Sequence, residues 1–376
     1  MAHIAIFCDG TWNSAQMAHG THVLRLSSAC ARSKMQKVLY FEGVGTGIGT
    51  ISKIGRWIGK MGGGLFGWGL NRNIKAAYAE LCKTYQPGDK ILIFGYSRGA
   101  YTARSLVGMI RKCGILNDPT ATNVNRAFRL YRTRGSKNKP DAPHIRAARR
   151  KLSPRFATSQ ADVLERQDDS CLVRIAYLGI WDTVGALGIP NALFGRIADL
   201  WNAQYKFHDT TLTHLVESAR HAVALDERRA LFAPSLWDNL DGSDENPGLN
   251  RGDDTSERAY QQKWFVGDHG IVGGTAQTRA LSEITLSWIW EGAASKGLML
   301  KPGLTIPQAK VNPGAQTDEI DDRSVIYLIF IWLVKWRAGP KRARDLDDSV
   351  RLRLATVSSY RPGSLFRLMP GLLRED

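Results

Sequence analysis

KILIFGYSRGAYTAR, at residues 90–104, joins an apolar run, a glycine-rich turn and a stretch of small residues. The Pro-Gly-Asp triplet at 87–89 is a turn signal, and the β-branched and aromatic residues at 91–94 are typical of a buried strand. After Ser97, glycine and alanine recur at spacings that let a helix pack closely on a sheet. The stretch therefore predicts a strand, a sharp turn and a helix.

The turn carries the pattern Gly-x-Ser-x-Gly, formed by Gly95, Ser97 and Gly99. In a nucleophile elbow the serine adopts a strained backbone conformation, and its Oγ stands clear at the edge of the sheet. Gly95 and Gly99 lack the Cβ atoms that would collide with the neighbouring strand and helix. We interpret Ser97 as a nucleophile; the alternative is a serine that only occupies a glycine-rich turn.

Two further polar residues follow predicted strands. Asp182 comes after the apolar run at 172–181, and His269 comes after a short strand at 263–266. The chain order of serine, aspartate and histidine is that of α/β-hydrolase triads. His269 would take the proton of Ser97 as the serine attacks an acyl carbon, and Asp182 would orient the imidazole.

Such chemistry also needs donors for the developing oxyanion. The N–H of Arg98, directly after the nucleophile, is one candidate. A second is the N–H of Gly10 or Thr11, because these residues follow a predicted strand at 3–8. A tight turn with a helix cap is the alternative interpretation of this segment.

The predicted strands and helices alternate along the chain, which indicates an α/β fold. We expect an α/β-hydrolase-like, mostly parallel central sheet flanked by helices, with helical insertions forming a cap. Residues 1–376 are predicted to form one domain, and residues 115–170 a basic helical insertion that serves as the cap. His208, His214 and His221 are expected to lie in helical surroundings.

The formal net charge is +16 and the pI is about 9.8, a balance that favours anionic partners. Residues 123–156 hold eleven Lys and Arg against a single acidic residue, Asp141. This segment is either a solvated helical surface or a contact for phosphate headgroups. No recognised nucleic-acid-binding motif accompanies the charge, which argues against nucleic acid as the partner.

A second basic and apolar segment lies at residues 320–345. Its apolar run, 325–334, is shorter than the about 20 residues needed to cross a bilayer. A tryptophan and a basic cluster follow this run: Trp336, with Lys335, Arg337, Lys341, Arg342 and Arg344. The segment is either part of the buried core or a membrane-facing element.

The five cysteines are widely spaced and mostly within apolar stretches, which indicates reduced thiols in a cytoplasmically made protein. We expect no metal and no cofactor. The cysteines form no zinc pattern, and the glycines at 43–49 lack the lysine and the spacing of a phosphate-binding loop. No signal peptide is visible. The predicted location is the cytoplasm, or a membrane reached by export without a cleavable signal.

Taken together, the motifs resemble a family of bacterial and fungal α/β-hydrolase domains first catalogued as a domain of unknown function. This family includes the Tle-type phospholipase effectors of type VI secretion. The matching stretches are FCDGTWN (7–13), GVGTG (43–47), GYSRGAYTAR (95–104), WDTVG (181–185), residues 221–229, GDH (267–269) and a closing Tyr-Arg-Pro (360–362). The resemblance implies a serine esterase that acts on phospholipid acyl chains, with Ser97, Asp182 and His269 matching the family's triad.

Two features depart from the family pattern. The family often reads His-Ser-Asp after the strand, whereas residues 269–271 read His-Gly-Ile, so the acidic residue is missing. The sequence also shows no counterpart of the large membrane-binding module of the better-known effectors. Three functions stay open: a phospholipase A-like lipid hydrolase, a soluble carboxylesterase or thioesterase, and a non-catalytic module that binds nucleic acid or an anionic surface. The first would act on phospholipid or another acyl ester, at an anionic membrane surface; the sequence does not indicate the oligomeric state.

Overall fold

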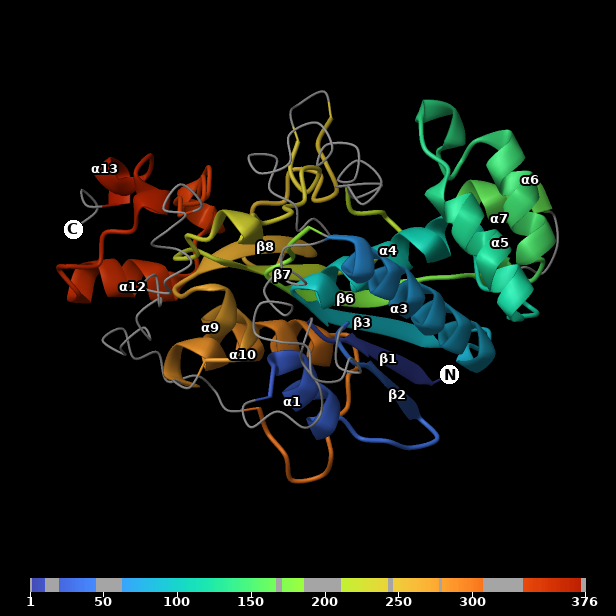
Figure 1. Ribbon diagram of the computed structural model, residues 1–376, viewed down its shortest axis with the longest axis horizontal. Helices are drawn as coiled ribbons and strands as arrows, with labels where there is room; N and C mark the ends of the chain where they lie inside the picture. The colour runs from blue at the N-terminus through green and yellow to red at the C-terminus, as the bar shows by residue number, and fades with distance from the viewer. Residues whose placement is uncertain are drawn as a thin grey trace.

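The computed structural model (Figure 1) describes residues 2–10, 20–44, 63–166, 171–185, 211–242, 246–276, 279–306 and 334–372. At its centre lies a six-stranded sheet in the order β2-β1-β3-β6-β7-β8, in which neighbouring strands are parallel. Its strands are β1 (His3–Cys8), β2 (Gln36–Phe41), β3 (Lys90–Tyr96), β6 (Ile175–Trp181), β7 (Ala219–Ala224) and β8 (Tyr260–Phe265). The prediction of a mostly parallel sheet flanked by helices is confirmed.

Helices cover both faces of the sheet (Figure 1), because successive side chains of a strand point to opposite faces. Ile4 and Ile6 of β1 pack with α3 and α4, whereas Ala5 and Phe7 pack with α1, α9 and α10. The helices are α1 (His22–Ala29), α3 (Gly63–Thr84), α4 (Arg98–Cys113), α5 (Ala121–Arg132), α6 (Pro143–Leu152), α7 (Gln160–Arg166), α9 (His269–Gly273), α10 (Arg279–Ser295), α12 (Asp348–Thr356) and α13 (Met369–Leu372).

Two predictions of local structure were wrong. The apolar run at 172–181 is not one strand, since β5 (Cys171–Leu172) pairs with β4 (Phe156–Ala157) and β6 begins only at Ile175. His221 lies on β7 and not on a helix, because this segment completes the sheet between β6 and β8. His214 lies in an irregular stretch, and His208 is outside the described residues.

The described part of the basic insertion does not form a cap over the elbow. A helix that follows a parallel strand runs back along the sheet, and α4 spans sixteen residues, or about 24 Å. Helices α5 and α6 pack against α4, and Figure 1 shows α5, α6 and α7 grouped at one side of the molecule, beyond α3 and α4. Not all basic residues of this insertion are solvated, because the Arg149 side chain is fully buried and its Nε donates to Asp162 at 2.9 Å.

The segment predicted to face a membrane is described only from residue 334 onward. Trp336 is 37% exposed, but Arg337 is buried at 8% exposure. Arg342 donates to Asp241 at 2.5 Å, so part of the basic cluster has partners within the protein. Within the described ranges, no helix combines the length and the hydropathy needed to span a membrane. The five cysteine thiols are free, and four of them are buried.

Candidate active site

Ser97 lies in a sharp turn between β3 and α4, with φ of 57° and ψ of −123°. This conformation is strained for a residue with a side chain. The flanking glycines allow the close approach of backbone segments: a Cβ on Gly95 would lie 2.6 Å from the Gly99 oxygen, and one on Gly99 would lie 2.1 Å from the Cys8 oxygen. The turn therefore has the geometry expected of a nucleophile elbow.

The structure brings Ser97, His269 and Asp182 together at the carboxyl edge of the sheet. His269 Nε2 lies 2.8 Å from Ser97 Oγ, and His269 Nδ1 lies 2.6 Å from Asp182 Oδ2. The carboxylate accepts from Nδ1–H, which leaves Nε2 to accept from the serine hydroxyl. All three side chains are buried. This arrangement can move a proton from Ser97 to His269 and stabilise the imidazolium that results.

Arg337 completes the surroundings of Asp182. Its two terminal nitrogens donate to Asp182, Nη1 to Oδ1 at 2.7 Å and Nη2 to Oδ2 at 2.9 Å. The same guanidinium donates to the Ala224 and Phe232 carbonyl oxygens, and the Ala224 N–H donates to Asp182 Oδ1 at 2.9 Å. Asp182 itself has a φ of 38°, so these bonds hold a strained residue in place.

The charge of Asp182 is fixed by this partner. Burial alone would raise the pKa of the Asp182 carboxyl, but the Arg337 charge and the hydrogen bonds from His269 and Arg337 lower it well below its usual range. Asp182 therefore stays ionised at every pH at which the protein would work. A bidentate guanidinium–carboxylate pair also fixes the plane of the carboxylate, and hence the direction in which it accepts from His269.

His269 is held from several sides. Its backbone N–H donates to Glu227 Oε2 at 3.2 Å, and the Tyr96 hydroxyl donates to its carbonyl oxygen at 3.0 Å. The rings of Tyr96 and Phe232 both lie 4.8 Å from the imidazole, measured between centroids. Burial would raise the pKa of Glu227, but hydrogen bonds from Arg229 and its charge lower it. An ionised, fully buried carboxylate thus anchors the backbone of His269.

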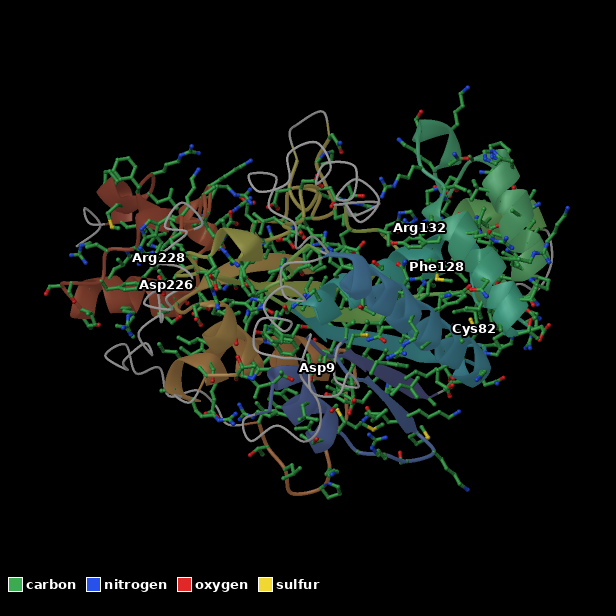
Figure 2. All side chains as sticks on the ribbon, viewed as in Figure 1. Asp9, Cys82, Phe128, Arg132, Asp226 and Arg228 are labelled. Carbon is green, nitrogen blue, oxygen red and sulfur yellow. The ribbon has the colours of Figure 1, made fainter. Side chains whose placement is uncertain are left out.

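The loop before His269 is anchored by a second carboxyl, Asp226, which lies near the C-terminal helices (Figure 2). The Gly267 N–H donates to Asp226 Oδ2 at 2.7 Å, and the Tyr360 hydroxyl lies 2.9 Å from Oδ1. Burial raises the pKa of Asp226 to about 6, although these hydrogen bonds favour the ionised form. Tyr360 therefore links the C-terminal segment to the histidine loop.

The structure describes two of the three candidate oxyanion donors, Gly10 and Arg98. The close contact of Gly99 with the Cys8 carbonyl places the end of β1 beside the elbow, as the prediction requires. However, the Gly10 N–H donates to Asp9 Oδ1 at 2.7 Å, so it is engaged within its own loop. Thr11 is outside the described residues. Arg98 begins α4 directly after Ser97, which keeps its N–H at the predicted position.

Asp9 stabilises this loop and is not paired with the triad. It accepts from the Thr21 and Tyr40 hydroxyls, both at 2.7 Å, besides the Gly10 N–H. Burial raises the pKa of Asp9 in spite of these bonds. The alternative interpretation of this segment as a tight turn thus agrees with the contacts of Asp9 and Gly10.

His221 supports the acid end of the triad without taking part in it. Its Nε2 accepts from the Thr183 N–H at 3.2 Å, and its Nδ1 lies 3.0 Å from Gln262 Oε1. The first bond makes Nε2 the unprotonated nitrogen, so the proton of the neutral ring is on Nδ1. Burial and the Arg104 charge lower the pKa of His221 to about 3, which keeps the ring neutral.

Comparison with known proteins gives the family of the chain. Residues 2–292 match the model of a family described as the catalytic domain of Tle1-like phospholipase effectors of the type VI secretion system. The chain belongs to this Tle1-like family. It is also 32% identical over 168 residues to the uncharacterized protein YEL023C of Saccharomyces cerevisiae, a match that covers 45% of this chain and 21% of that protein. The chain thus matches only about a fifth of this relative's length.

Two solved structures are similar to this Tle1-like chain. One is an uncharacterized protein from Pseudomonas aeruginosa, with 14% identity and a TM-score of 0.40, covering 80% of this chain and 46% of the other. The second is the Tle1 effector bound to the VgrG spike of the type VI secretion system, with 18% identity and a TM-score of 0.34, covering 73% and 51%.

Arg337 lies outside the residues matched by the Tle1-like catalytic domain, in the segment that the sequence left either as part of the buried core or as a membrane-facing element. For this residue the buried alternative holds, since its guanidinium is buried against Asp182. The roles of Glu227 and Asp226 were also missed, although both follow a buried strand, as Asp182 does. In the described part of this Tle1-like chain, no group of three His, Cys, Asp or Glu side chains could hold a metal ion.

Proposed function

We propose that the chain is a serine hydrolase that cleaves carboxylic esters of lipids, in the manner of a phospholipase A, through an acyl-enzyme intermediate. The observation that carries the proposal is the hydrogen-bonded line from Ser97 Oγ through both nitrogens of His269 to Asp182. Membership of a family described by phospholipase effectors supports a lipid ester as the substrate. The net charge of +16 supports action at an anionic membrane surface.

The mechanism follows from the geometry. His269 Nε2 takes the proton of Ser97 as Oγ bonds to the ester carbonyl carbon. The carbonyl oxygen gains the negative charge, which the Arg98 N–H and a second donor from the loop after β1, with Thr11 as the candidate, would stabilise. His269 then gives the proton to the departing alcohol oxygen, and the acyl group stays on Oγ. Water deprotonated by the same nitrogen releases the fatty acid and restores Ser97.

The protein would meet its substrate at a membrane. We propose export without a cleavable signal as the route, because the family is one of type VI secretion effectors. The basic insertion at 115–170 would contribute to binding anionic lipid through its lysine and arginine side chains.

The proposal is tested by fatty-acid release from phosphatidylglycerol vesicles and by labelling with a fluorophosphonate probe. We expect Ser97→Ala to abolish both, while Ser33→Ala, a change to an exposed serine before β2, leaves both intact. Undiminished acyl release by folded Ser97→Ala would rule the proposal out. Labelling of Ser97 with hydrolysis of short esters alone, and no rise in rate on bilayers, would favour a soluble carboxylesterase or thioesterase.

A further inference from the structure

A cavity lies along α4, and none of the triad residues lines it. It has a volume of about 540 Å³, within the usual range of ligand sites. One face of α4 contributes Arg104, Val107, Gly108 and Arg111, and the loop after α5 forms the opposite wall. The lining residues of α4 begin about 10 Å from Ser97 along the helix axis.

The lining of this cavity is strongly cationic. None of the described residues that line it is acidic. Five of its side chains are positively charged: Arg104, Arg111, Lys112, Arg134 and Lys139. Arg104, Arg111 and Lys112 are buried at 7%, 5% and 6% exposure, whereas Arg134 and Lys139 are exposed at the mouth. Buried cations are costly unless an anion compensates them.

Lys112 shows this cost most clearly. Its ammonium donates to the Thr133 carbonyl oxygen at 2.7 Å and to the Thr133 hydroxyl at 2.8 Å, and both acceptors are neutral. Its neighbour Arg111 donates to Asp141 at 2.5 Å, but this carboxylate is 53% exposed and does not line the cavity. Among the described residues, no carboxylate is hydrogen-bonded to this buried lysine charge beside the open space.

Burial also lowers the pKa of Lys112, and burial together with the Arg111 charge lowers that of the nearby His214. The Asp141 charge opposes the shift at His214, whereas burial alone accounts for the direction at Lys112. Hydroxyl and amide groups of Thr133, Ser136 and Asn138 complete the lining and can bind further oxygen atoms of a ligand.

We propose that this cavity is a binding site for a phosphate-bearing ligand. A phosphate group offers several acceptor oxygens and up to two negative charges, which match the lysine and arginine side chains around the space. The volume exceeds what a free phosphate needs, so the ligand would be a phosphate ester with an organic group against Val107, Leu178 and Trp237. The ester is either a phospholipid headgroup or a soluble phosphomonoester.

The test uses the full chain with Ser97→Ala, so that binding is read without turnover and independently of the proposed hydrolase activity. Thermal unfolding is followed with inorganic phosphate or glycerol 3-phosphate, against chloride at equal ionic strength. We expect a rise in Tm of about 2 °C or more with glycerol 3-phosphate. Lys112→Met should abolish this rise, and the exposed change Lys139→Gln should reduce it. Lys83→Gln, a matched loss of charge on α3, should retain it.

The same variants separate ligand binding from a structural role of Lys112. A site built for an anion predicts that Lys112→Met is at least as stable as its parent in chloride, because an uncompensated charge is removed. A purely structural lysine predicts the reverse, a lower Tm with the phosphate shift intact, and this would overturn the proposal. The absence of any shift in the parent would overturn it too. If Lys112→Met does not fold, an undiminished shift in Lys139→Gln would count against the site.

Vesicles of phosphatidylglycerol and of phosphatidylcholine identify the source of the phosphate. Sedimentation with phosphatidylglycerol that falls at least threefold in Lys112→Met, but not in Lys83→Gln, would assign the cavity to a lipid headgroup. A glycerol 3-phosphate shift that depends on Lys112, with vesicle binding unchanged in Lys112→Met, would assign it to a soluble ester. Both results support a phosphate site.

Discussion

Replacement of Arg337 by methionine tests whether this residue sets the charge of the triad carboxylate. The change removes two hydrogen bonds to a buried Asp182 and leaves those from His269 and Ala224. Breaking a buried ion pair in this way costs about 3–5 kcal/mol. Asp226 indicates the pKa that Asp182 would have without Arg337. It is a buried carboxyl hydrogen-bonded by uncharged donors, and its pKa is raised to about 6.

If Asp182 moved to that value, its ionisation at neutral pH would cost about 3 kcal/mol relative to an ordinary carboxyl of pKa about 3.9. In the native protein the lowered pKa of Asp182 gives stability that is fully present above about pH 4 and is lost only below it. In the variant the folded state binds this proton more tightly, so stability falls as pH rises from about 4 to 6. The difference between the two proteins is therefore largest at neutral pH, which urea unfolding at pH 4.5 and pH 7 measures.

Catalysis should slow as well, because the carboxylate loses the two bonds that fix its plane and the direction in which it accepts from His269. We expect kcat/KM on a p-nitrophenyl ester at pH 7 to fall about 10-fold, which corresponds to about 1.4 kcal/mol. Arg337→Lys should recover part of the activity, because it keeps the charge but not the two-pronged geometry. Arg342→Met, in the same segment, is the control: this arginine is partly exposed, so its loss costs about 1 kcal/mol or less. Native activity and a native pH dependence of stability in Arg337→Met would refute the reasoning.

Three further predictions concern the surroundings of the triad. Asp226→Asn should remove a fall in stability that the native protein shows between about pH 4 and pH 6, because the pKa of Asp226 is raised to about 6 and ionisation opposes folding; chemical unfolding across this range measures it. Gly99→Ala should lower stability by about 1–3 kcal/mol and slow fluorophosphonate labelling, since its Cβ would lie 2.1 Å from the Cys8 oxygen. Glu227→Gln should lower kcat about 10-fold with KM little changed, because a weaker acceptor then faces the His269 N–H; steady-state kinetics on the same ester checks this.

The sequence was sufficient for the strand, turn and helix around Ser97, because each signal there is local. An apolar run, two glycines and small helix residues all act within fifteen positions, and the strained turn follows from them. The positions of Asp182 and His269 could be predicted by a rule of the fold: polar residues after parallel strands meet at one edge of the sheet. The hydrogen bonds of 2.6 and 2.8 Å agree with that rule.

The errors concern residues whose surroundings are set by distant parts of the chain. His221 and its neighbours have no strong local preference for a strand, and pairing with β6 and β8 on either side decides their conformation. The basic insertion was expected to form a cap over the triad, but its described helices α5 and α6 pack against α4, on one face of the sheet. Neither effect can be read from the composition of the segment.

Arg337 is the most informative of these residues, because its sequence neighbours suggest a surface and its contacts are those of a core. A charge run is usually solvated, and nothing local distinguishes one arginine of the cluster from the next. What distinguishes Arg337 is its partner. The Asp182 carboxylate, buried at the end of β6, requires a cation, and Arg337 provides it from 155 residues later in the chain. In the same way, the Tyr360 hydroxyl hydrogen-bonds the buried Asp226 carboxyl. Residues 334–372 therefore belong with the proposed active site in physical terms, although the family match ends at residue 292, because Asp182 would hold a buried charge without its arginine partner if Arg337 were absent.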